Sequence, residues 1–234
     1  MERFNFLMSS SYPEEQLCLY FWCLSIVAAL TVTMKPSIWM RDLVLHGKLV
    51  APSPQRGFLV PKRWFYHFYL FGIFAVLALS KDRGSVGTVC LLVHLLRRLV
   101  EELWIFHKSG SSRMHVGAYM FGYLFYTGVA LSVPNNPGCI SAWIVGNVIE
   151  AVSHIQLAHN GFVNPSKNKP PDTLLFRYMN CPHYFAEMLI YVGLASVGKL
   201  ESIACAVFVI VSLSVNWRNH SLWYSKKQSY IKNE

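Results

Sequence analysis

Seven runs of apolar residues, separated by polar segments, alternate along this chain of 234 residues. The first five have the length of about 20 residues, within a range of roughly 17–25, that a helix needs to cross a bilayer. The last two are shorter, and a polar turn at 198–202 separates them, so they are either two short spans or a tight helical hairpin. The pattern predicts an all-α fold, a polytopic membrane bundle of about seven transmembrane helices that forms a single domain over residues 1–234. The runs are Leu17–Met34, Trp64–Ser80, Gly87–Phe106, Val116–Val133, Cys139–Leu157, Tyr184–Val197 and Ile203–Trp217.

The composition supports a membrane protein and argues against one that binds nucleic acid. Hydrophobic residues make up 53% of the chain and charged residues only 14%, whereas a soluble domain carries about 25% charged residues. The net charge of +9 comes from Lys and Arg residues that lie between the apolar runs rather than along one face. With the loop 35–63 in the cytosol, the cytosolic segments hold 15 Lys and Arg residues and the opposite segments hold 4. By the positive-inside rule, residues 1–16 then lie across the membrane from the cytosol and the C-terminus lies in the cytosol.

The third apolar run contains five ionisable side chains within nine residues: His94, Arg97, Arg98, Glu101 and Glu102. Arg97 and Glu101 are four residues apart, as are Arg98 and Glu102, so each pair could neutralise itself on one helix face. Ionisable groups at membrane depth are expensive and usually mark a functional site. Five such groups exceed what pairing requires, which favours a polar cavity that holds an anionic ligand. We expect helices three and five to seven to form a wet, charge-lined pocket at the inner leaflet, with room for a dinucleotide.

Polar side chains also collect at the cytosolic ends of the later runs. Glu150 and His154 are four residues apart in the fifth run, and we favour a hydrogen-bonded helix face here over a metal site because no second ligand pair has suitable spacing. His220 and Tyr224 are likewise four apart, on either a polar face or an aromatic belt. A further carboxylate, Glu187, lies inside the sixth apolar run. It follows a cluster of side chains that can hydrogen-bond: Tyr178, Asn180, His183 and Tyr184.

Four sequence blocks between residues 60 and 224 carry a resemblance to a known family. The chain resembles the steroid 5-alpha-reductase family, and most closely its polyprenol reductase branch. The resemblance implies a seven-helix reductase of the endoplasmic reticulum membrane, with a lumenal N-terminus and a cytosolic tail at 225–234. Such an enzyme takes NADPH from the cytosol and a long-chain isoprenoid lipid from the bilayer. The blocks are 60–69, 97–103, 114–122 and 181–191.

The resemblance also implies roles for individual residues. Arg98 and the loop residues Lys167 and Lys169 are candidates for the phosphates of NADPH. Glu187 is assigned to the carboxamide of the nicotinamide rather than to proton transfer. The remaining implied contacts with the cofactor are His154, Tyr178, His183, His220 and Tyr224.

The implied reaction saturates the α-isoprene double bond of a polyprenol and yields dolichol, the glycan carrier of protein N-glycosylation. Hydride transfer to a carbon–carbon double bond needs electron withdrawal at its far end, which an isolated allylic alcohol hardly provides. A conjugated aldehyde has a carbonyl that can take up the developing charge with the help of a hydrogen-bond donor. We therefore expect polyprenal to be the species reduced. Tyr69, Glu101 and Glu102 are the candidate catalytic proton donors, and their spacing does not rank them.

The sequence is also compatible with two other functions. One is a related reductase that acts on a steroid or an enoyl thioester. The other is a non-catalytic, C-terminally divergent family member, which three departures from the family pattern support. His183 stands where the family has Asn, Arg218 lies only two residues before His220, and the expected Tyr-Pro-x-x-Arg motif does not occur in the tail.

Overall fold

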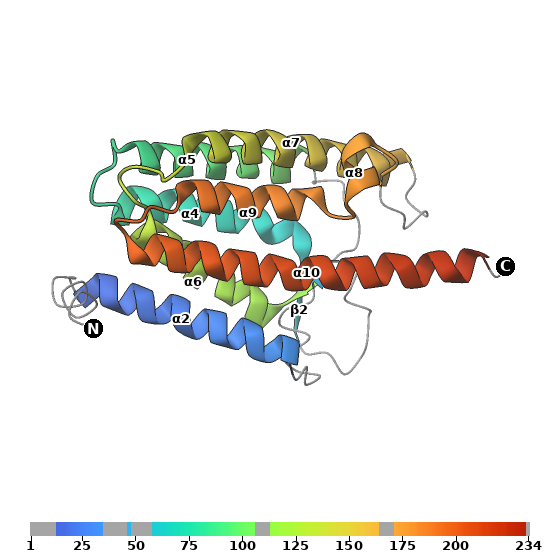
Figure 1. Cartoon of the computed structure of the whole chain (residues 1–234), viewed down its shortest axis with the longest axis horizontal. Coiled ribbons are helices and arrows are strands. Elements are labelled where there is room, and N and C mark those ends of the chain that lie inside the picture. Colours follow the sequence, from blue (N-terminus) through green and yellow to red (C-terminus); the bar gives the residue numbers. More distant parts are fainter. Residues whose placement is uncertain (1–12, 35–45, 48–57, 106–112, 164–170, 233–234) are drawn as a thin grey trace.

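The computed structural model describes residues 13–34, 46–47, 58–105, 113–163 and 171–232. Each of the seven apolar runs coincides with one long helix, and these helices lie side by side in one elongated bundle (Figure 1). The predicted helical fold is therefore confirmed. The long helices are α2 (Pro13–Met34), α4 (Tyr66–Leu79), α5 (Val86–Val100), α6 (Val116–Ser132), α7 (Ile140–Val163), α9 (Pro182–Leu194) and α10 (Leu200–Lys232).

Two helical segments in this described part of the chain are long and apolar enough to cross a membrane by length and composition, Pro13–Val32 and Leu200–Ser225. Two more, Arg63–Leu79 and Val116–Ser132, are apolar but shorter. The number of spans is thus not fixed at seven by helix length. The last apolar run is not a short span, because α10, which has 33 residues in all, continues past Trp217 into the polar segment that follows. It forms a hairpin with α9, as one of the two readings of the sequence expected.

A small antiparallel sheet, absent from the all-α prediction, lies beside the helices. Its strands are β1 (His46–Gly47), β2 (Leu59–Pro61) and β3 (Arg113–His115), in the order β1-β3-β2. A 3₁₀ turn at Lys62–Phe65 joins β2 to α4, and a short helix, α8 (Leu174–Tyr178), precedes α9. The strands are two or three residues long, too short to give an alternating pattern in the sequence.

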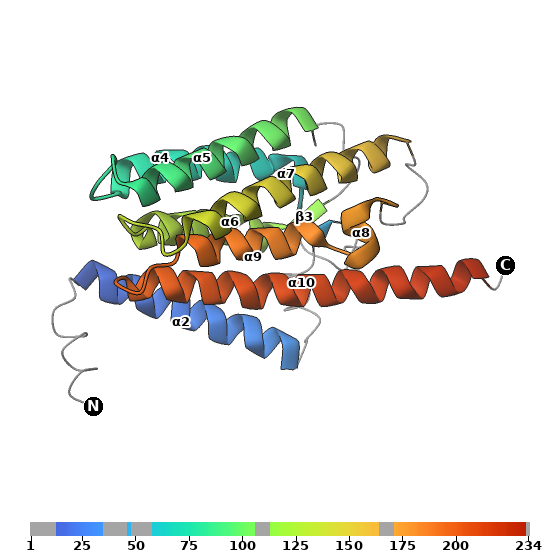
Figure 2. The same cartoon turned by 45° about the horizontal axis from the view of Figure 1, so that its top comes forward.

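Glycines set the close packing of α9 against α7. A Cβ atom on Gly193 would lie 2.5 Å from the backbone nitrogen of Trp143, and one on Gly146 would lie 2.7 Å from the Ile190 side chain. Small residues at these positions let the two helix backbones approach. On its other side α9 packs against α10, so α9 lies between α7 and α10 (Figure 2).

The two ends of the bundle differ. The start of α2 and the α4–α5, α6–α7 and α9–α10 turns meet at one end, at the left in Figure 1. Helix α8 and the later part of α10 lie at the other end. The ionisable side chains singled out in the sequence belong to the half of the bundle nearer α8.

Candidate functional site

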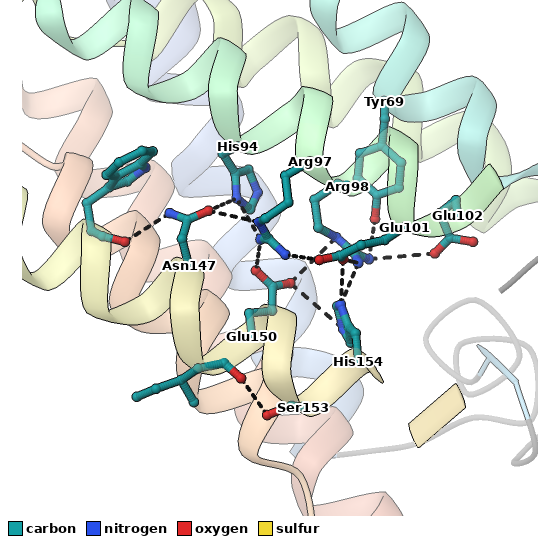
Figure 3. A network of polar contacts seen from close by, with 12 residues as sticks. Tyr69, His94, Arg97, Arg98, Glu101, Glu102, Asn147, Glu150, Ser153 and His154 are labelled. Carbon is teal, nitrogen blue, oxygen red and sulfur yellow. Dashed lines mark hydrogen bonds and ion pairs between the residues drawn. The ribbon is translucent and has the colours of Figure 1, made fainter. Parts of the chain in front are cut away.

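Helix α5 is followed directly by a π-helical turn, Glu101–Ile105, and its two arginines lie in its last turn. A π turn adds one residue to the helical repeat and is often found at functional sites. Here Arg97, Arg98 and Glu101 converge on the side chains that α7 presents to them (Figure 3). Glu101 is 4% exposed and Arg98 is 6% exposed, so the charges meet inside the bundle.

Arg97 bridges the two helices. Its guanidinium pairs with Glu101 of its own helix and with Glu150 of α7. Its Nε donates to the side-chain oxygen of Asn147 at 3.1 Å. His94 Nδ1 lies 3.2 Å from that same oxygen. Asn147 therefore fixes the position of Arg97 between two carboxylates.

Arg98 connects this network to α4. Its Nη1 donates to Glu101 Oε2 at 2.6 Å and its Nη2 donates to the hydroxyl oxygen of Tyr69 at 2.7 Å. Glu102 Oε1 lies 3.6 Å from Nη2. On the α7 side, His154 Nδ1 lies 2.7 Å from Glu101 Oε2. Tyr69, Glu101 and Glu102, which the sequence named as candidate catalytic residues, are thus brought together around one guanidinium.

The charges of this network are paired with one another. Two arginines and three glutamates from α5, the π turn and α7 form ion pairs within and between the helices. The guanidinium of Arg98 faces Tyr69, Glu101 and Glu102. The wet pocket expected from the sequence and the contact of Arg98 with a cofactor phosphate stay predictions.

A row of ring side chains, which we call the ring file, extends from the network across α9 to α10. It consists of His154, His183, Tyr184 and His220. The rings of His154 and His183 lie 5.7 Å apart, those of His183 and Tyr184 lie 4.3 Å apart, and those of Tyr184 and His220 lie 5.8 Å apart. Three of the predicted cofactor residues, on α7, α9 and α10, therefore follow one another in space. Tyr224 is one helical turn beyond His220 and packs edge-on against Trp223 at 5.0 Å.

The other predicted cofactor residues are placed differently. Tyr178, at the end of α8, is 82% exposed and lies outside the buried network. Lys167 and Lys169 fall outside the described residues. Asn180, which precedes α9, donates to Ser221 Oγ of α10 at 3.3 Å and ties this segment to the ring file. Burial raises the pKa of the neighbouring Cys181 thiol to about 12, which favours the neutral thiol over the reactive thiolate.

Glu187 is a hydrogen-bond acceptor that is available to a ligand. It lies on α9, one turn beyond His183, and is partly buried. Its carboxylate is within electrostatic reach of Arg97, Arg98 and Glu150. With the described residues it makes no hydrogen bond and no ion pair. An acceptor without a partner next to a file of rings suits the amide donors and flat ring of a nicotinamide, so the residues present fit such a cofactor.

Asn147, His94 and Glu150 belong to the network, although no catalytic or cofactor-binding role was predicted for them from the sequence. For α7 the amino-acid sequence contains a signal of a shared polar face. Asn147, Glu150 and His154 are spaced by three and four residues and so lie on one side of the helix. The pairing of Arg97 with Glu150 had no such signal, since it depends on how α5 and α7 are rotated against each other.

Comparison with known proteins gives one consistent group. The family model for 3-oxo-5-alpha-steroid 4-dehydrogenase matches residues 114–233. The chain is 28% identical to a polyprenal reductase of Saccharomyces cerevisiae over 92% of its own length and 93% of the yeast protein. It is 31% identical to an uncharacterised protein of Schizosaccharomyces pombe, with 79% of each chain covered. It is 26% identical to a polyprenal reductase of Homo sapiens, with 82% of each chain covered.

Proposed function

Because the chain belongs to the 3-oxo-5-alpha-steroid 4-dehydrogenase family, we propose that it is an NADPH-dependent reductase of the α-isoprene double bond of polyprenal in dolichol synthesis. The similarity to the yeast polyprenal reductase, which extends over nearly the full length of both chains, carries this proposal. The family resemblance seen in the sequence blocks is confirmed. The product aldehyde is the precursor of dolichol, and its formation consumes one hydride and one proton.

The chemistry of the side chains selects the proton donor. Glu101 is held between two arginines, and Glu102 also faces Arg98. A carboxylate with arginine partners is stabilised in its ionised form and acts as an acceptor. Tyr69 keeps its O–H proton while its oxygen accepts from Arg98. Of the three candidates, Tyr69 is therefore the group able to donate to the carbonyl oxygen of the aldehyde.

Arg98 supports this role through charge. As Tyr69 gives up its proton toward the substrate, negative charge develops on the phenolic oxygen. A guanidinium 2.7 Å from that oxygen stabilises the charge without having to move. Glu101 and His154 hold the guanidinium in place from the other side.

The cofactor supplies the hydride. On this chain, Glu187 would accept hydrogen bonds from the carboxamide, and the rings of His183, Tyr184 and His220 would pack against the flat groups. Their position on the later helices, close to the long cytosolic loop 158–183 of the predicted topology, supports entry from the cytosol. We further place the chain in the endoplasmic reticulum membrane with its C-terminus in the cytosol, in line with the distribution of Lys and Arg.

Reduction assays with the purified protein test the substrate. Polyprenol and polyprenal of equal chain length are supplied separately with NADPH, and oxidation of NADPH is followed together with the lipid product. We expect turnover of the aldehyde and little or none of the alcohol. Faster turnover of the alcohol defeats the proposed substrate.

The mutual pairing of the charges favours a second candidate, a non-catalytic family member. In that case the network is a structural element that lets α5 and α7 pack, and no cofactor enters. Binding of NADPH to the detergent-solubilised protein separates the two. Saturable binding supports the reductase, and absence of binding supports the structural role.

A further inference from the structure

A cavity of about 550 Å³, lined by both polar and apolar residues, lies at the end of the bundle opposite α8. It opens among the start of α2 and the α4–α5, α6–α7 and α9–α10 turns, at the left in Figure 1. Thr88, near the start of α5, lines it, whereas Glu101 follows the end of the same helix. At a rise of 1.5 Å per residue, these two positions are about 20 Å apart. The cavity is therefore separate from the charge network and has the volume of a small-molecule site.

Glu201 lines this cavity although its side chain is only 6% exposed. It makes no hydrogen bond and no ion pair within the described ranges of the chain. Glu201 lies in the first turn of α10, where the positive end of the helix dipole stabilises a negative charge. Burying a carboxylate remains costly unless a cation or a hydrogen-bond donor meets it. The position therefore suits a cationic ligand group.

Lys199 supplies the opposite charge on the same wall. Its ammonium donates to the backbone oxygen of Val133 at 3.1 Å, which leaves further N–H donors for a ligand. Burial lowers the pKa of Lys199, and the nearby Glu201 carboxylate opposes that shift. A second ammonium, that of Lys81, is paired with Glu15 at 3.2 Å. The cavity thus presents an acceptor and a donor of opposite charge next to each other, which is the complement of a zwitterion.

The rim of the cavity is apolar and open to its surroundings. Leu79 and Leu200 line it and are 42% and 37% exposed. From there α2 presents Leu17 and Leu24, which are 71% and 70% exposed, along the outside of the bundle. A ligand with a zwitterionic headgroup and apolar chains matches a charged cavity that lies beside an apolar outer surface. We propose that the cavity binds the headgroup of an aminophospholipid, with its primary ammonium against Glu201 and its phosphate against Lys199.

Native mass spectrometry of the purified full chain tests the proposal. The protein is titrated with phosphatidylethanolamine, phosphatidylcholine and phosphatidylglycerol of identical acyl chains, and with soluble phosphoethanolamine. We expect phosphatidylethanolamine to bind at least about tenfold more tightly than the other two lipids, because of the three it alone carries a cationic group that also donates hydrogen bonds. Equal binding of the three lipids overturns the proposal. Soluble phosphoethanolamine that binds as tightly as the lipid overturns it as well and assigns the cavity to a free headgroup.

Two variants connect the preference to this cavity. Glu201→Gln should abolish the preference for phosphatidylethanolamine, while Asp172→Asn, which removes an exposed carboxylate at the other end of the bundle, should keep it. Gly198→Leu provides a second route, since a Cβ atom there meets no atom within 4 Å and the side chain would fill open space at the cavity. It should reduce binding of phosphatidylethanolamine without any change of charge. Retention of the preference in Glu201→Gln, or unchanged binding of phosphatidylethanolamine to Gly198→Leu, contradicts the site.

Discussion

The hydroxyl oxygen of Tyr69 on α4 accepts a hydrogen bond of 2.7 Å from Arg98 on α5. The same guanidinium carbon lies 4.9 Å from the centre of the Tyr69 ring. Because the oxygen is occupied as an acceptor by a cation, the phenolic proton is directed away from Arg98. This geometry is compatible with the proposed role of Tyr69 as a hydrogen-bond donor, and Glu101 and Glu102 of the π turn contact the same guanidinium.

Tyr69→Phe should lower kcat by about 100- to 10,000-fold, the usual contribution of a general acid. The affinity for NADPH should stay as in the wild type, because Tyr69 contacts Arg98 and not the ring file of the later helices. Steady-state kinetics with polyprenal and a separate NADPH titration measure the two effects. Tyr126→Phe is the matched control, as its ring packs against Tyr69 at 5.8 Å and it has no assigned proton role. Equal losses in both variants would point to packing instead of proton donation.

Glu187→Gln should weaken NADPH binding by about tenfold, since a hydrogen bond to a charged acceptor contributes roughly 1.5–3 kcal/mol and Gln keeps only a neutral one. Binding of the lipid should change little. Isothermal titration with each ligand gives both dissociation constants. Asp172→Asn makes the same chemical change at an exposed ion pair with Arg177 and should leave NADPH binding unaltered. Unchanged cofactor affinity in Glu187→Gln removes Glu187 from the cofactor site.

Glu150→Ala should lower the free energy of unfolding by about 3–5 kcal/mol, because it leaves Arg97 with one carboxylate less inside the bundle. Glu150 is fully buried and pairs with Arg97 across the α5–α7 contact. Reversible unfolding in mixed detergent micelles measures the change. Asp172→Ala, at the exposed pair, should cost less than about 1 kcal/mol. A loss of similar size in both would mean that the buried network contributes nothing special to stability.

Gly193→Ala should destabilise the fold by about 1–3 kcal/mol, the range for an overpacked core position. The added Cβ would lie 2.5 Å from the Trp143 backbone nitrogen and would push α9 from α7. Gly198→Ala adds the same methyl group where no atom lies within 4 Å and should be tolerated. Thermal midpoints of the two purified variants decide between these expectations. Equal midpoints would show that α7 and α9 can separate at little cost.

The sequence predicts the helices better than it predicts contacts between segments that are distant in the chain. Each long helix has a local signal, a predominantly apolar run, and every such run is helical in the structure. The sheet has none, because Met114 pairs with both His46 and Val60, which are distant in the sequence, over strands of two or three residues. Helix α10 passes the end of its apolar run because polar residues are also compatible with helix.

The candidate site also has a part that local sequence signals predict and a part that depends on tertiary packing. The spacing of Arg97, Arg98 and Glu101 within one run identified the network locally. Whether such charges line a space or pair with each other depends on the opposite helix, and Glu150 of α7 decides it in favour of pairing. The cavity at the other end was not foreseen, because its lining comes from several separate turns and each contributes only a few ordinary polar residues.

Transfer of deuterium from stereospecifically labelled NADPH to polyprenal is the decisive measurement. We predict one deuterium at C3 of the lipid product, from one of the two labelled faces only, and a Tyr69→Phe variant that transfers it far more slowly. Product that forms without deuterium at C3, or a protein that neither binds NADPH nor consumes polyprenal, would contradict the assignment of this chain as a polyprenal reductase.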